Sequence, residues 1–112
     1  MKKRILDFEL KGLKLIGVGD FSNIVKGTKG YLRCRFVFSD EWKNITVIAT
    51  FSNKEKEYAT FVKKSMVDLS YDGVCDIPDD ILTDTVFTLH LVGVDKRNNY
   101  KIKSTGFEIR QV

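Results

Sequence analysis

Alternation of apolar and polar residues with a period of two is the dominant pattern along this chain. In the segment YLRCRFVF at 31–38, every even position is apolar, and Arg33 and Arg35 occupy the opposite face. The segment ITVIATF at 45–51 repeats the alternation and is rich in β-branched residues, which favour strands over helices. Because successive side chains of a strand point to opposite faces, both segments are predicted to be half-buried strands.

The rest of the chain supplies further candidate strands separated by turn signals. Residues 85–94 (TVFTLHLVGV) are apolar on both faces and predict a long central strand. Shorter strands are predicted at 5–10, 13–18, 58–62, 67–69, 74–77, 100–103 and 107–112. Turns are predicted at 17–20, 27–30, 71–73 and 97–99. Pro78 followed by two aspartates predicts one helical turn over 78–82.

These elements predict an all-β sandwich of seven to eight mostly antiparallel strands with one short helical turn. With 112 residues, of which 43% are hydrophobic, the chain has the size of a single domain spanning residues 1–112. The inward positions predict the core, and Trp42 is predicted to cover one end of it. The predicted core residues are Leu32, Cys34, Phe36, Phe38, Ile45, Val47, Ala49, Phe51, Phe87, Leu89 and Leu91.

Charge is unevenly distributed along the chain, although the formal net charge is only +4. Residues 1–35 hold nine basic and three acidic side chains, whereas residues 66–95 hold seven aspartates and no Lys or Arg. Residues 96–112 are basic again. Strands distant in sequence can neighbour each other in a sheet, so two outcomes stay open. The blocks form a polarised surface that favours salt-sensitive association, or they neutralise each other on one surface.

Two groups of charged residues are candidates for binding a partner. Arg33 and Arg35, with Tyr31 nearby, predict a basic strip of the kind that binds phosphates and stacks bases. The alternative is that these arginines protect a sheet face from aggregation or pair with the aspartates. The full set of candidate partner-binding residues is Arg33, Arg35, Asp76, Asp79, Asp80, Asp84, Lys96 and Arg97.

Residues suited to catalysis or metal binding are sparse. The one histidine, His90, lies in the predicted central strand, where we expect a packed and hydrogen-bonded side chain. Two cysteines and one histidine are fewer than the four ligands of a typical zinc site. The aspartates at 76, 79, 80 and 84 lack the alternating spacing of a helical calcium loop, and we expect them to be solvated. We therefore predict no catalytic residue, metal or cofactor.

The cysteines and the N-terminal segment bear on the compartment. Cys34 and Cys75 lie in apolar, strand-like segments, and we expect both to be reduced thiols. Residues 1–12 contain no apolar stretch of signal-peptide length. No stretch approaches the roughly 18 apolar residues of a membrane span. We expect synthesis in a cytoplasm and no membrane association.

Several framework segments resemble those of a known group of modules. The segments are GYLRCRFVF at 30–38, EWK at 41–43, IATF at 48–51, CDIP at 75–78 with IL at 81–82, and FTLHLVG at 87–93. They resemble small immunoglobulin-like β-sandwich modules of tailed-bacteriophage virion proteins, of the head-decoration, head-fibre and baseplate type. Cys34 and Trp42 also resemble the packed pair of an immunoglobulin domain. Cys75 lies on a short strand before Pro78, so no immunoglobulin disulfide is expected.

The resemblance implies an immunoglobulin-like sandwich that acts without catalysis, as a virion structural or decoration module. Its partners would be other virion proteins or copies of itself, and it would be made in the host cytoplasm and located in the virion. One alternative is a phage-encoded inhibitor of a host defence nuclease, whose acidic surface imitates a nucleic-acid backbone. A second alternative is a nucleic-acid-binding β-barrel that uses the basic strip at Arg33 and Arg35.

Overall fold

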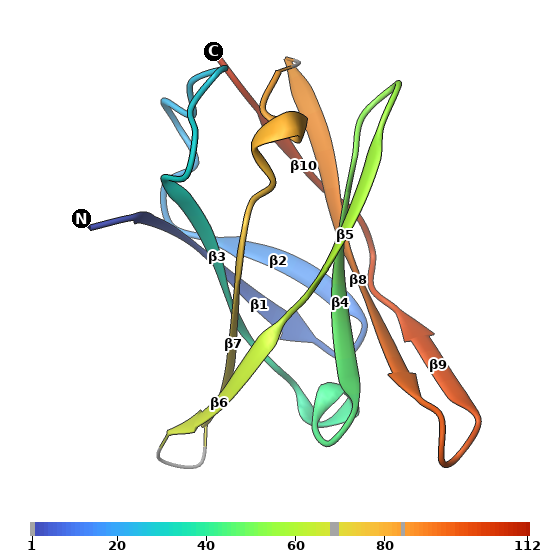
Figure 1. The fold of residues 1–112 in the computed structure, drawn as a ribbon. Coiled ribbons are helices and arrows are strands. Elements are labelled where there is room, and N and C mark those ends of the chain that lie inside the picture. Colours follow the sequence, from blue (N-terminus) through green and yellow to red (C-terminus); the bar gives the residue numbers. More distant parts are fainter. Residues whose placement is uncertain (1, 68–69, 84) are drawn as a thin grey trace.

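The structure, a computed structural model, describes residues 2–67, 70–83 and 85–112, arranged as two β-sheets (Figure 1). In spatial order, sheet A contains β2 (Lys14–Val18), β1 (Arg4–Lys11), β3 (Leu32–Val37), β7 (Ser70–Asp76) and β6 (Lys63–Val67). Sheet B contains β10 (Phe107–Arg110), β8 (Val86–Asp95), β4 (Thr46–Ser52) and β5 (Glu57–Phe61), with β9 (Tyr100–Lys103) also paired to β8. Two 3-10 turns are present, η1 (Asp40–Trp42) and η2 (Asp79–Ile81).

The predicted all-β sandwich is confirmed. The described residues form ten strands rather than seven to eight, because short candidate segments such as β9 form strands of their own. The helical turn predicted after Pro78 is present as η2. All strand pairs are antiparallel except β1 with β3, which run parallel. No helix among the described residues has the length and apolar character needed to cross a membrane.

One predicted turn is wrong. Residues 71–73 lie inside β7 rather than at a turn, and Gly73 pairs with Phe36 of β3 and Lys64 of β6. A Cβ on Gly73 would lie 2.5 Å from Cγ1 of Val62 and 2.7 Å from Cε2 of Phe38. Gly73 therefore allows close packing over the core, and it does not supply the positive φ of a hairpin turn.

The hydrophobic core lies between the two sheets and contains most of the predicted residues. All eleven predicted positions are buried except Ile45, which is partly buried against the core. Trp42 is fully buried, its ring stacks on Phe38, and its Nε1 donates a 2.8 Å hydrogen bond to the carbonyl of Gly12. The core extends beyond the prediction through residues of β1, of the loops and of β10: Leu6, Phe8, Leu10, Ile24, Ile81, Leu82 and Ile109.

The chain passes from one sheet to the other between β5 and β6. β5 pairs with β4 in sheet B, whereas β6 pairs with β7 in sheet A, and only Val62 separates the two strands. Val62 is buried, and its N–H donates to the carbonyl of Val47 at 2.9 Å. The crossing runs diagonally across the front of the molecule in Figure 1. It places Phe61, the last residue of β5, at the margin where the two sheets diverge.

Candidate functional site

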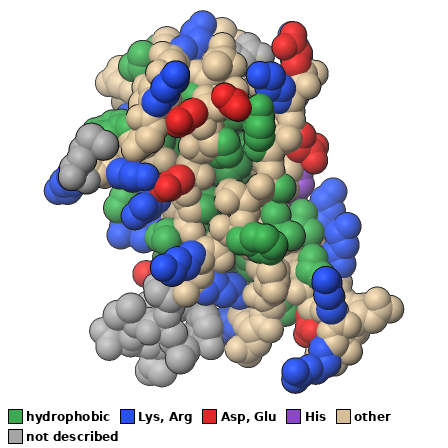
Figure 2. All heavy atoms as spheres, in the orientation of Figure 1, with side chains coloured by type: hydrophobic (Ala, Val, Ile, Leu, Met, Phe, Trp, Pro, Cys, Tyr) green, Lys and Arg blue, Asp and Glu red, His purple; other side chains and the backbone are tan. Residues whose placement is uncertain are grey.

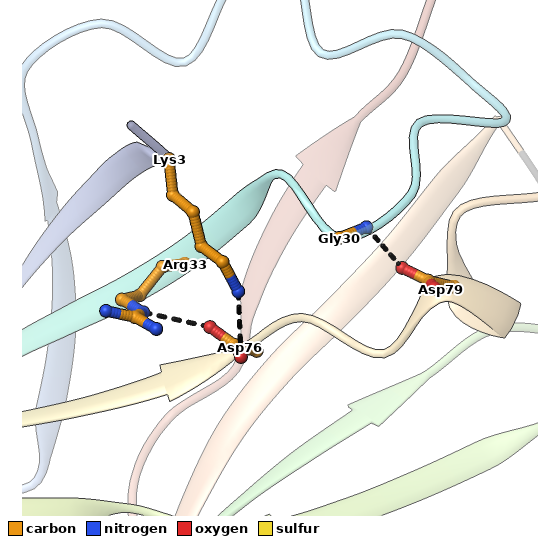
Figure 3. Close-up of polar contacts among 5 residues, drawn as sticks. All are labelled: Lys3, Gly30, Arg33, Asp76 and Asp79. Carbon is orange, nitrogen blue, oxygen red and sulfur yellow. Dashed lines mark hydrogen bonds and ion pairs between the residues drawn. The ribbon is translucent and has the colours of Figure 1, made fainter. Parts of the chain in front are cut away.

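The predicted basic strip lies on the outer side of sheet A, but its arginines are paired with carboxylates. Arg33 Nε donates to Asp76 Oδ1 at 2.9 Å, and Lys3 Nζ donates to Asp76 Oδ2 at 3.0 Å (Figure 3). Arg35 Nε donates to Asp7 Oδ1 at 2.7 Å. The hydrogen bond from Arg33 is the main reason that the pKa of Asp76 is lowered. Sheet register thus joins basic and acidic segments, and the strip is largely neutralised.

The acidic candidates around η2 make contacts within the chain. Asp79 Oδ1 accepts a 2.8 Å hydrogen bond from the backbone N–H of Gly30, which ties η2 to the loop before β3 (Figure 3). Asp80 Oδ2 accepts a 3.3 Å hydrogen bond from the hydroxyl of Tyr58. Asp84 lies outside the described residues. The described aspartates of this region therefore have structural partners.

The remaining basic candidates lie at the opposite end of β8 from η2. Lys96 and Arg97 belong to the turn between β8 and β9. Asp95 Oδ1 accepts hydrogen bonds from the backbone N–H groups of Arg97 and Asn98, at 3.1 and 3.3 Å. Among the predicted site residues that the structure describes, the one contact is between Arg33 and Asp76. The predicted set is thus distributed over the molecule.

The groups with chemical reactivity are embedded in the sheets. Cys34 and Cys75 face each other in the register of β3 and β7, and both are buried free thiols. Burial is the main cause of a strongly raised pKa for Cys34. His90 lies opposite Thr50 in sheet B, and desolvation is the main cause of its lowered pKa. Within residues 2–67, 70–83 and 85–112, no three His, Cys, Asp or Glu side chains gather into a potential metal site.

An exposed apolar surface on sheet B was missed by the sequence reasoning. Phe61 is 71% exposed. It lies opposite Ile48 of β4, which in turn lies opposite Val92 of β8. Two residues further along the ladder, at the next pair on the same face, Thr46 lies opposite Val94. Directly opposite residues share a face of the sheet, so these five residues form one surface, which we call the Phe61 face.

The Phe61 face is hollowed and has a basic side. A depression of about 470 Å³ adjoins Phe61 and is lined by Ile45, Thr46, Ile48, Val94 and Lys96, among others. On β9, Lys101 lies opposite Val94 and Lys103 lies opposite Val92, so both lysines border the same face. Figure 2 shows hydrophobic side chains gathered over β4 and β5, with Lys and Arg side chains along the side of β9.

The sequence did contain a signal for the exposed ring. In the segment YATFV at 58–62, Val62 shares its face with Tyr58 and Thr60, and Phe61 falls on the opposite face with Ala59. If Val62 faces the core, Phe61 must face outwards. The local pattern did not reveal which of the two adjacent apolar residues is buried, because that depends on the crossing between the sheets.

Comparison with known proteins finds no matching protein family, no matching characterised protein and no matching solved structure.

Proposed function

We propose that this chain is a non-enzymatic protein-binding module that docks on its partner through the Phe61 face. The exposed Phe61 ring carries the proposal, because it stands beside Ile48 and Val94 on a paired sheet. Exposed apolar clusters of this kind are typical of interaction surfaces. Aromatic side chains on a rigid support contribute strongly to binding, since little conformational entropy is lost when they are covered.

The charges around the Phe61 face define the chemistry of the partner. Lys96, Lys101 and Lys103 border its apolar centre on one side. A partner that offers an apolar pocket beside acidic groups complements this surface. Its association is expected to slow and weaken as salt rises, because exposed charges are screened over about 8 Å at physiological ionic strength.

For the identity of the partner, we propose a protein of a tailed-phage virion, with the chain acting as a structural or decoration module. The resemblance of the framework segments at 30–38 and 87–93 to virion modules supports this assignment. An all-β sandwich with an exposed sheet face suits such a role, since it presents a rigid surface to a coat protein.

The two alternative functions have less support from the geometry. A nucleic-acid binder would need free cations on the basic strip, whereas Arg33 and Arg35 are paired with Asp76 and Asp7. A mimic of a nucleic-acid backbone would need a row of free carboxylates. Asp76 contacts two cations, and Asp79 accepts a backbone hydrogen bond.

Purified virions of the phage that encodes the chain provide the test. Mass spectrometry should detect the chain in them, and virions that lack it should rebind the purified protein. Phe61→Ser should abolish rebinding. Val37→Ser is the matched control, because Val37 is an exposed apolar residue (43%) on a strand of the other sheet, and it should leave rebinding unchanged. Absence from virions contradicts the virion assignment, and full rebinding by Phe61→Ser contradicts the docking face.

A further inference from the structure

The outer strand of sheet B, β5, has an open edge. Within the described strands, β5 pairs with β4 alone. Val62, one residue past its end, donates to the carbonyl of Val47 in β4. Hydrogen-bonded and non-hydrogen-bonded pairs alternate along an antiparallel ladder. Counting back from Val62, the residues whose backbone groups bond to β4 are therefore Thr60 and Tyr58.

The alternate residues of β5 direct their backbone groups to the open edge. These are Glu57, Ala59 and Phe61, each with one N–H and one C=O. Two other outer strands are covered or guarded: the β2 edge hydrogen-bonds Thr105, and β9 carries two lysines, which discourage strand pairing. β5 contains neither Lys nor Pro, and its sequence EYATF is rich in strand-forming residues.

Space for an additional strand lies beside this edge. Because the chain leaves sheet B after β5, a depression of about 450 Å³ opens between the end of β5 and sheet A. Thr60 and Lys63 line it on one side, and Arg33, Val74 and Cys75 line it on the other. The inward-facing side chains of a strand added to β5 would lie over this depression.

We propose that a second copy of this chain binds here, with the two β5 strands antiparallel and a two-fold axis at Ala59. In this register Glu57 of each copy pairs with Phe61 of the other, and Ala59 pairs with itself. The small Ala59 side chain avoids a clash at the axis. The two copies of sheet B then form one continuous sheet, as in other complexes built by strand addition.

Charge favours a second copy in this orientation. Glu57 is the first residue of β5, Glu55 lies in the bend before it, and Lys63 lies two residues after its end; all three are exposed. Antiparallel pairing centred on Ala59 brings the end of the strand that carries Glu55 and Glu57 in one copy towards Lys63 of the other, and symmetry repeats this attraction. A parallel arrangement would instead place Glu57 beside its own copy, which is repulsive.

The dimer goes beyond the proposed docking function and is separable from it. The interface uses the backbone of β5, so Ile48 and the β9 lysines stay uncovered. The two Phe61 faces come to lie on the same side of one sheet, which gives a partner two binding sites that act together. Loss of the dimer therefore does not remove the Phe61 side chain, and loss of the ring does not remove the edge.

Sedimentation velocity over a range of protein concentrations, without any partner, tests the dimer. Ala59→Pro removes the N–H that points to the open edge but no hydrogen bond to β4, and proline is tolerated at such edge positions. Two intermolecular hydrogen bonds are lost by symmetry, so dimerisation should weaken by about tenfold or more. Ala59→Thr is the matched control, because it keeps the N–H and the strand preference, and it should remain a dimer.

Two further results complete the test. Lys63→Glu should weaken the dimer, and combination with Glu55→Lys should restore it. Thermal unfolding of dilute samples should show that Ala59→Pro remains folded. The proposal is overturned if the wild-type protein is monomeric throughout the concentration range. It is also overturned if folded Ala59→Pro dimerises as tightly as Ala59→Thr, because the interface would then lie elsewhere.

Discussion

Truncation of Phe36 tests the alternation that builds the core. Phe36 is fully buried in β3, between Phe8 and Phe38, with ring centroids 5.4 Å and 6.1 Å away. Phe36→Ala removes the middle ring of this stack and leaves a cavity, which typically costs about 3–5 kcal/mol. Aromatic contacts on both sides place the expected loss in the upper part of that range. Since domains of this size are stable by about 5–15 kcal/mol, a large share of the stability is lost.

The assay is equilibrium unfolding in urea, with the free energy of unfolding compared between variants. Val37→Ala is the matched control, because Val37 is the next residue of β3 and lies on the opposite, solvent-facing side. Its expected loss is below about 1 kcal/mol. A loss below about 1 kcal/mol for Phe36→Ala, or similar losses for both variants, would refute the register, since a shift of one residue exchanges the two faces.

Three further predictions concern single polar side chains. Lys64 Nζ donates to two main-chain carbonyls, so Lys64→Met should destabilise the protein by about 1–3 kcal/mol in urea unfolding; no loss would contradict this role. Burial lowers the pKa of His90 in the folded protein. The neutral imidazole therefore stabilises the fold above the pKa of unfolded histidine, about 6.5, and this contribution is lost as pH falls through the folded-state pKa. An NMR titration should give a midpoint below the unfolded value, and His90→Gln should flatten the pH dependence of stability. The pKa of Asp76 is lowered mainly by Arg33, so this carboxylate stabilises the fold above about pH 3.9 and the effect disappears in acid. Arg33→Ala should raise the Asp76 midpoint in a carboxyl NMR titration, and an unchanged midpoint would contradict the pairing.

Local periodicity sufficed for the strands and for most of the core. Each strand buries one face, so a period of two places the side chains of Cys34 and Phe36 in the core. The same argument places Val47 and Phe51 there. The helical turn after Pro78 was also predictable, since proline and aspartate favour the start of a helical turn.

The pairing of strands was not predictable in the same way. β1 pairs in parallel with β3, although β2 and a long loop separate the two strands in the sequence, and the chain changes sheet at Val62. Such contacts depend on the whole set of buried faces and not on any one segment. Gly73 illustrates the limit: its sequence suits a hairpin turn, but packing against Phe38 and Val62 places it within a strand.

The candidate site shows the same dependence on pairing. Arg33 and Asp76 lie far apart in the sequence and meet because β3 and β7 are neighbours. Charge blocks along the chain therefore do not map directly onto surface patches. Phe61 was missed because its exposure follows from the crossing between β5 and β6, which only the tertiary structure defines.

The most direct test of whether sheet B binds proteins at its β5 edge is amide hydrogen exchange in the wild-type protein. The exchange rate of each residue is measured over a series of protein concentrations. The amides of Tyr58 and Thr60 bond to β4 and should be protected at every concentration. The amides of Ala59 and Phe61 point to the open edge, so they should be protected in concentrated samples and should lose that protection on dilution. Rapid exchange of Ala59 and Phe61 at all concentrations, with Tyr58 and Thr60 protected, would contradict the interface.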